Sequence, residues 1–234
     1  MNSNIKRNSI LAVILFLLYL GQNILRNMLV NMLAVNEFAA TLITAVVFAA
    51  SALLLTKKDD YFKGRNKDKF CITYIAIVTL ILGLINLIPF DISIDISVLS
   101  VIVTMFFVSL MEELIFRGCV YKICEAKWGG KKAVILSSIL FGFIHIINVL
   151  NDDIAVVALQ IAYATSIGVV FAILIYKKQG IYLSILAHAV INITANIGAT
   201  ETIYKEIIFS VICVIFAVIV VVKYNLAVKN PEED

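Results

Sequence analysis

Eight apolar runs, each near the length of a membrane-spanning helix, recur along almost the whole chain. A helix needs about 20 apolar residues to cross a bilayer. Runs close to that length lie at Ser9–Leu25, Phe38–Leu55, Phe70–Ile88, Val98–Arg117, Ala133–Val149, Ile154–Tyr176, Ile181–Ile197 and Ile207–Val222. This pattern predicts an all-α fold, a polytopic integral membrane bundle of about eight transmembrane helices in one membrane domain spanning residues 1–234.

The composition excludes a soluble domain. Of the 234 residues, 62% are hydrophobic and 15% are charged, whereas soluble domains are about 45–50% apolar and about 25% charged. The four cysteines lack the spacing of a metal site, and we interpret them as small apolar residues or free thiols.

The distribution of positive charge predicts the topology. If the N-terminus is cytoplasmic, 17 of the 19 basic residues lie on the cytoplasmic side, and only Arg26 and Lys205 lie outside. This distribution satisfies the positive-inside rule and places the C-terminus in the cytoplasm as well. The net charge of +3 therefore reflects membrane topology and needs no nucleic-acid partner.

The first apolar run differs from the others because it carries a polar stripe at helical spacing. We expect this stripe to be an interfacial extension of the helix rather than the lining of a cavity, and we expect the run to be retained rather than cleaved as a signal peptide. Its members are Gln22, Asn23, Arg26, Asn27 and Asn31.

Very few polar side chains capable of chemistry fall inside the predicted spans. An ionisable group in hydrocarbon is expensive and therefore marks a candidate functional site. Only two acidic residues enter a span, and both histidines of the chain do so, together with two asparagines of the seventh span. They are Glu112, Glu113, His145, His188, Asn192 and Asn196.

The spacing of the polar residues on the fourth span suggests separate roles. Glu113 and Arg117 are four residues apart with the acid first, the favourable order for an ion pair on one helix face. Glu112 points about 100° away on the helix and is free to face a cavity, where desolvation would make it a stronger base. The alternative is that all three cap a cytoplasmic helix end, since Arg117 marks that end and lies about 7 Å from Glu112.

The other two groups share a helix face in the same way. Phe141 precedes His145 by four residues, and His188 precedes Asn192 by four. Each histidine taken alone is more typical of a packing residue than of a catalyst. However, Glu112, His145 and His188 all fall at similar depth, in the cytoplasmic half or near the middle of the membrane. We therefore expect one polar site.

Three motifs in this order, EExxxR, FxxxH and HxxxN, resemble those of the CPBP family of intramembrane proteases. Here they are residues 112–117, 141–145 and 188–192, and the resemblance covers a catalytic core at about 98–197. The family includes CAAX prenyl endopeptidases and bacterial proteins linked to bacteriocin processing and self-immunity. The resemblance implies an integral protein of a bacterial plasma membrane, surrounded by membrane lipids.

The resemblance also implies a role for each motif residue. Glu112 would activate the attacking water with His145 as its partner, and His188 and Asn192 would stabilise the oxyanion. Glu113, Arg117 and Phe141 would support them. The implied reaction is cleavage of a peptide or lipidated protein tail near the cytoplasmic face.

Two questions stay open at this point. Glu112, His145 and His188 could hold a divalent metal such as Zn²⁺ with an open position for water, or a glutamate could drive hydrolysis without metal using the same residues. The chain could also be a non-catalytic self-immunity or regulatory membrane protein, or a proton-linked transporter, since buried glutamate and histidine also form proton relays.

Overall fold

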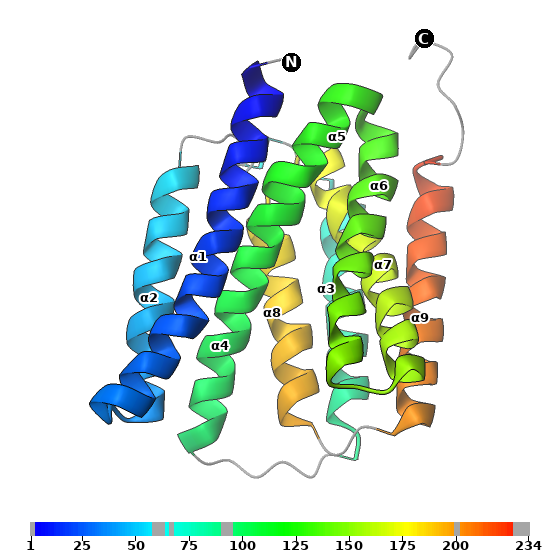
Figure 1. Ribbon diagram of the computed structural model, residues 1–234. Coiled ribbons are helices and arrows are strands. Elements are labelled where there is room, and N and C mark those ends of the chain that lie inside the picture. The colour runs from blue at the N-terminus through cyan, green and yellow to red at the C-terminus, as the bar shows by residue number, and fades with distance from the viewer. Residues whose placement is uncertain (1–2, 58–63, 66–67, 90–95, 199–201, 227–234) are drawn as a thin grey trace.

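The computed structural model describes residues 3–57, 64–65, 68–89, 96–198 and 202–226, and every regular element in these ranges is helical (Figure 1). The α-helices are α1 (Ser3–Leu33), α2 (Glu37–Thr56), α3 (Lys69–Leu87), α4 (Ile96–Glu113), α5 (Tyr121–Trp128), α6 (Gly130–Phe143), α7 (Ile154–Tyr176), α8 (Tyr182–Ile197) and α9 (Ile203–Lys223). A π-helix, η2 (Leu114–Val120), joins α4 to α5, and a 3₁₀-helix, η3 (Ile144–Leu150), continues α6.

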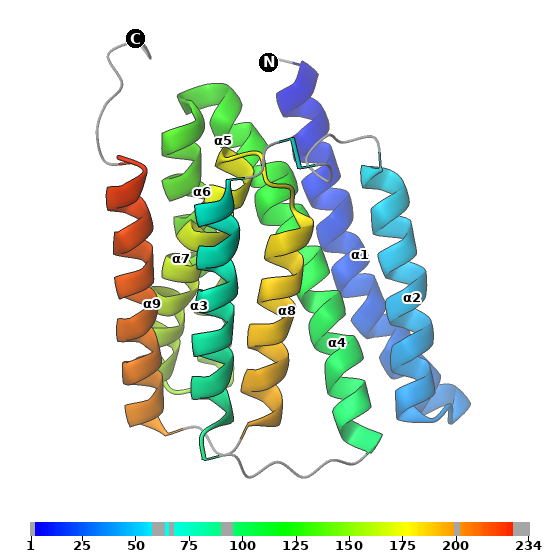
Figure 2. The same ribbon diagram turned by 180° about the vertical axis from the view of Figure 1, so that it is seen from behind.

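The long helices run up and down past one another as a bundle. Figures 1 and 2 show that α1 begins and α9 ends at the same end of the molecule, as an even number of crossings requires. In the described part of the chain, seven helical stretches are long and apolar enough to cross a membrane. The remaining predicted span, the seventh along the chain, is α8, which has only 16 residues. The prediction of an all-α polytopic membrane bundle is confirmed.

The fourth span does not end at Arg117, so that prediction is wrong. Helices α4, η2 and α5 form one stretch from Ser97 to Trp128, 32 residues long. The charged residues after Arg117 form a helix because no glycine or proline interrupts them between positions 119 and 128. The stretch ends at Gly129, which adopts a φ of 80° that favours glycine. Arg117 lies inside this stretch and not at a helix end, and its side chain is fully buried.

Two members of the polar stripe of α1, Gln22 and Arg26, contact α2, whereas Asn23, Asn27 and Asn31 are exposed. The Gln22 side chain is buried and its Nε2 donates to Thr44 Oγ1 at 3.0 Å. One turn further along, Arg26 donates through Nε to Thr41 Oγ1 at 2.9 Å and forms an ion pair with Glu37. The helix is also longer than predicted, with 31 residues.

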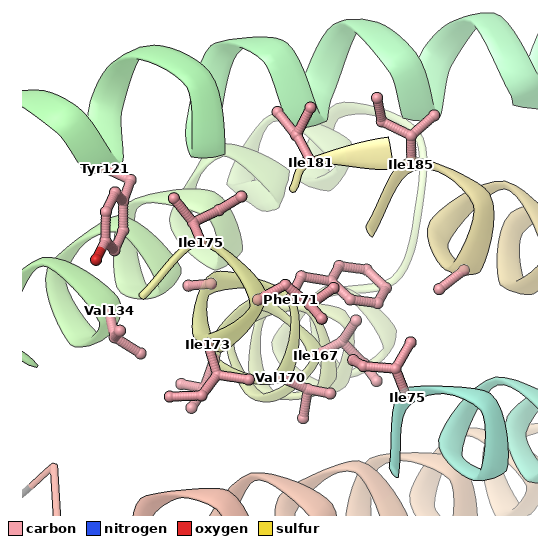
Figure 3. Packing of buried hydrophobic residues seen from close by; sticks show 14 of the residues in the cluster. Ile75, Tyr121, Val134, Ile167, Val170, Phe171, Ile173, Ile175, Ile181 and Ile185 are labelled. Atoms are coloured by element: carbon pink, nitrogen blue, oxygen red, sulfur yellow. The ribbon is translucent and has the colours of Figure 1, made fainter. Parts of the chain in front are cut away.

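Helix α7 lies at the centre of the packed half of the bundle and contacts α6 and α9. Figure 3 shows its side chains Val170, Phe171 and Ile173 reaching toward surrounding helices, with Ile75 of α3 and Ile185 of α8 nearby. Close packing and interhelical hydrogen bonds stabilise helices within a bilayer. This central helix forms the wall behind the candidate site.

Candidate active site

The candidate site begins where α4 passes into the π-helix η2. Glu112 and Glu113 are the last residues of α4, and Arg117 lies in the middle of η2. A π-helical turn inside a longer helix is rare and often lies at a functional site. The two carboxylates lie at the midpoint of the 32-residue stretch, well inside the bundle.

Glu113 and Arg117 form a fully buried ion pair. Their Oε1 and Nη1 atoms are 3.3 Å apart, and both side chains have zero exposure. Arg117 also donates through Nη2 to the carbonyl oxygen of Gly168 at 3.2 Å, and its guanidinium lies 4.3 Å from the centre of the Phe141 ring. The contact expected from the spacing is present, and α6 and α7 help to hold it.

His188 of α8 lies between the two glutamates. Its Nδ1 is 3.0 Å from Glu113 Oε1, and its Nε2 is 3.6 Å from Glu112 Oε2. An ionised Glu113, paired with Arg117, can only accept a hydrogen bond, so His188 Nδ1 carries the hydrogen. This assignment leaves Nε2 facing Glu112, whose side chain is 21% exposed.

Two phenylalanine rings hold the imidazole of His188. The Phe141 ring meets it edge to face with centroids 5.6 Å apart, and the Phe171 ring lies 5.5 Å away. Phe141 therefore contacts both the buried arginine and His188. The environment on this side of the imidazole is apolar, which strengthens the polar contacts on the other side.

Asn192 lies one turn along α8 from His188, in the same interface with α4. Its Nδ2 donates to Ser109 Oγ at 3.2 Å, and Ser109 is fully buried. The structure thus brings Glu112, Glu113, Arg117, His188 and Asn192 to one place, the crossing of α4 and α8.

His145 lies beside this cluster rather than in it. It belongs to η3 and its Nδ1 hydrogen-bonds with the Phe141 carbonyl oxygen at 3.0 Å. Its ring meets the Phe141 ring edge to face at 5.3 Å. Within the described residues it forms no ion pair with either glutamate, so it reaches the site through Phe141.

The candidate metal ligands Glu112, His145 and His188 do not form a metal-binding group. Among the residues that the structure describes, no three His, Cys, Asp or Glu side chains are placed to hold an ion. Both nitrogens of His188 also face carboxylates, and His145 bonds to a backbone carbonyl. The side chains present do not fit a bound metal, so we derive no step through one.

Three residues of the site were missed by the sequence interpretation. Ser109 binds Asn192, Gly168 accepts from Arg117, and Phe171 packs on His188. The signal for Ser109 was available, because it precedes Glu113 by four residues just as His188 precedes Asn192 by four. Nothing in the sequence singles out Gly168 or Phe171 on the apolar α7.

The site combines groups that amide hydrolysis needs. Glu112 is a partly accessible carboxylate beside an imidazole, and Asn192 adds an amide donor one turn away. The buried ion pair of Glu113 and Arg117 fixes the imidazole from behind. A positioned base together with donors for a developing negative charge is typical of hydrolytic sites.

Comparison with known families agrees with this chemistry. A family model described as type II CAAX prenyl endopeptidase Rce1-like matches residues 94–194. No curated protein matches the chain. The matched segment contains every motif residue of the site and confirms the predicted family resemblance. Residues 94–194 form a domain of the Rce1-like type II CAAX prenyl endopeptidase family, within a chain whose described part has seven helical stretches long and apolar enough to cross a membrane.

Proposed function

We propose that this protein is an intramembrane endopeptidase that uses Glu112 to activate water against a peptide bond. The observation that carries the proposal is the position of His188, whose two ring nitrogens face Glu113 at 3.0 Å and Glu112 at 3.6 Å. Helix packing alone does not require a buried ion pair that orients an imidazole toward a more accessible carboxylate. The family match supports the same reaction class.

In the proposed reaction Glu112 takes a proton from water as the water oxygen bonds to the carbonyl carbon. The carbonyl oxygen becomes an oxyanion, which accepts hydrogen bonds from Asn192 Nδ2–H and from Nε2–H of a His188 that carries hydrogen on both ring nitrogens. Glu112 then gives its proton to the leaving nitrogen as the carbon–nitrogen bond breaks. When His188 carries hydrogen on both nitrogens, the charges of Glu112, Glu113, Arg117 and His188 sum to zero, which suits a low-dielectric site.

His145 keeps the role implied by the family resemblance, as the partner of Glu112. Its Nδ1 bonds to the Phe141 carbonyl, so the free Nε2 is the nitrogen available for a water or substrate contact. Its contact with Glu112 would be made through a water molecule or substrate lying between them. The variant His145→Ala tests this assignment.

We propose that the site opens to the cytoplasm, with both termini on that side. Helices α1 and α3 begin, and α7 and α9 end, at one end of the bundle (Figure 1), and Lys6, Lys69 and Lys177 belong to these helix ends. Glu112 lies ten residues from Lys122, or about 15 Å along the helix. The proposed substrate is a membrane-associated peptide or protein tail, such as a lipidated segment or a bacteriocin, whose cut bond enters from this face.

The test is cleavage by purified protein in liposomes. The substrates are peptides ending in Cys-aliphatic-aliphatic-X, with and without a prenyl group on the cysteine, and mass spectrometry identifies the products. Glu112→Gln keeps the shape of the side chain but removes the base, so kcat/KM should fall by about 10²–10⁴. Glu125→Gln is the matched control, since Glu125 lies on the same long helical stretch but pairs with Lys122 at the surface.

Equal cleavage by Glu112→Gln and the wild type contradicts the proposal. Two other functions would be recognised by different results, one in cells and one in the same liposomes. A non-catalytic immunity or regulatory protein would give its full cellular phenotype with Glu112, His145 and His188 all changed to alanine. A proton-linked transporter would change the pH of the liposome lumen or its content of a solute, and it would form no peptide product.

A further inference from the structure

Helices α4 and α8 face each other through two matched rows of side chains. On α4 the row is Met105, Ser109 and Glu113, and on α8 it is His188, Asn192 and Asn196, each row spaced by four residues. The helices are antiparallel (Figure 2), so the first member of one row faces the last member of the other. We call these two rows the α4–α8 polar ladder.

Every rung of the α4–α8 polar ladder is a direct polar contact. Glu113 Oε1 and His188 Nδ1 are 3.0 Å apart, and Asn192 Nδ2 donates to Ser109 Oγ at 3.2 Å. At the third rung Asn196 Nδ2 lies 3.3 Å from Met105 Sδ. The rungs extend from the buried ion pair toward the far end of the bundle.

A ladder with this spacing fixes both the rotation and the height of α8. Successive residues on a helix differ by about 100° and 1.5 Å, so a slip of one residue would turn all three α8 side chains away from α4. Such a slip would separate His188 from both glutamates. Helices in a bilayer gain little from apolar contact with one another, so interhelical hydrogen bonds help to determine how they pack.

The side chain of Asn196 also contacts the backbone of Asn192, the α8 member of the middle rung. Its Nδ2 donates to the Asn192 carbonyl oxygen at 2.9 Å as well as contacting Met105. Asn192 is therefore held through its side chain by Ser109 and through its carbonyl by Asn196. This rigid placement suits an amide that must meet an oxyanion without moving.

We propose that Ser109 and Asn196 are positioning residues that set α8 in register, so that His188 and Asn192 meet the reacting carbonyl together. The inference rests on the proposed function for its catalytic consequence. The register itself is a property of the molecule that does not depend on activity.

The first experiment tests the register by disulfide formation. The double variant Met105→Cys/Asn196→Cys should form a disulfide on mild oxidation, identified by mass spectrometry of the linked peptides. The matched control is Thr104→Cys/Asn196→Cys, in which one cysteine is rotated by one position around α4. Equal cross-linking of the two pairs would overturn the ladder.

The second experiment tests whether Ser109 positions His188, again without an activity assay. The chain has two histidines, so ¹⁵N-histidine labelling gives two imidazole signals, and His145→Gln assigns them. Ser109→Ala should shift the His188 nitrogens and leave those of His145 in place. Ser100→Ala, on the same helix but outside the ladder, is the control. A spectrum of Ser109→Ala identical to that of the wild type would overturn the positioning role.

The third experiment connects the ladder to catalysis. Ser109→Ala should lower kcat at least about tenfold with KM changed less than about twofold, because substrate binding remains while the donor is misplaced. Ser109→Thr keeps the hydroxyl and should restore most of the rate. If Ser109→Ala keeps the wild-type kcat while Glu112→Gln is inactive, the positioning proposal fails and the proposed function stands. If the wild type cleaves no peptide while the register and imidazole tests succeed, the proposed function alone fails.

Discussion

Replacing Arg117 by methionine should strongly destabilise the protein. The change removes the 3.3 Å ion pair with Glu113, the 3.2 Å hydrogen bond to Gly168 and the cation–π contact with Phe141. It leaves the Glu113 carboxylate at zero exposure without its cation. Removing one partner of a buried ion pair lowers the free energy of unfolding by about 3–5 kcal/mol. This loss raises the unfolding equilibrium constant by a factor between about a hundred and a few thousand.

A double variant distinguishes the effect of an unpaired buried charge from the effect of lost side-chain volume. Glu113→Leu/Arg117→Met removes both charges, and replacing a whole buried pair by apolar residues is often neutral or stabilising. The double variant should therefore be more stable than Arg117→Met alone. An unpaired buried charge, rather than lost volume, is then the cause.

The assay is unfolding by dodecyl sulfate in mixed micelles, followed through the single tryptophan of the chain, Trp128. The control is Lys122→Met, which breaks the 2.9 Å pair with Glu125 at the surface and should cost at most about 1 kcal/mol. If Arg117→Met unfolds within about 1 kcal/mol of the wild type, or if the double variant is the less stable of the two, the reasoning is wrong.

Three further predictions concern other parts of the molecule. Gly142→Ala should destabilise the α6–α7 contact by at least about 1–3 kcal/mol, because its Cβ would lie 1.9 Å from Thr165 Oγ1. The control is Gly83→Ala, whose Cβ would have no atom nearer than 3.7 Å. Equal unfolding midpoints of the two variants would contradict the reasoning. Gln22→Leu should weaken the α1–α2 contact by about 0.6–2 kcal/mol through loss of its hydrogen bond to Thr44, and unfolding in mixed micelles measures this loss. Exhaustive chelation, with metal removal checked by metal analysis, should leave peptide cleavage unchanged, since the described side chains form no metal-binding group. Activity that is lost on chelation and restored by Zn²⁺ would contradict this prediction.

The sequence predicted most of the helices and the contact between Glu113 and Arg117, because both follow from local periodicity. A run of apolar residues fixes a span, and a spacing of four places two side chains on one helix face. The approach of His188 to both glutamates needs the crossing of α4 and α8. That crossing depends on how side chains of distant segments pack, so the motifs indicated a shared site without its geometry.

The departures from the prediction concern polar and charged side chains whose partners lie on neighbouring helices. The sequence predicts a helix end at Arg117, because arginines are rare within the hydrocarbon region. Its neutralising partner Glu113 and the Gly168 carbonyl make burial possible. Likewise, Gln22 and Arg26 find partners on α2, which a pattern confined to one helix cannot reveal.

The shortness of α8 has a consequence for the surrounding lipid. Its 16 residues span about 24 Å, several ångströms less than the hydrocarbon thickness of about 30 Å. Hydrophobic mismatch of this sign is relieved when the bilayer thins beside the short helix. The thinning would occur beside the helix that carries His188, and it would shorten the path of water to Glu112. We expect the rate of cleavage to fall as the acyl chains of the host membrane lengthen, which would make the lipid itself a regulator of the reaction.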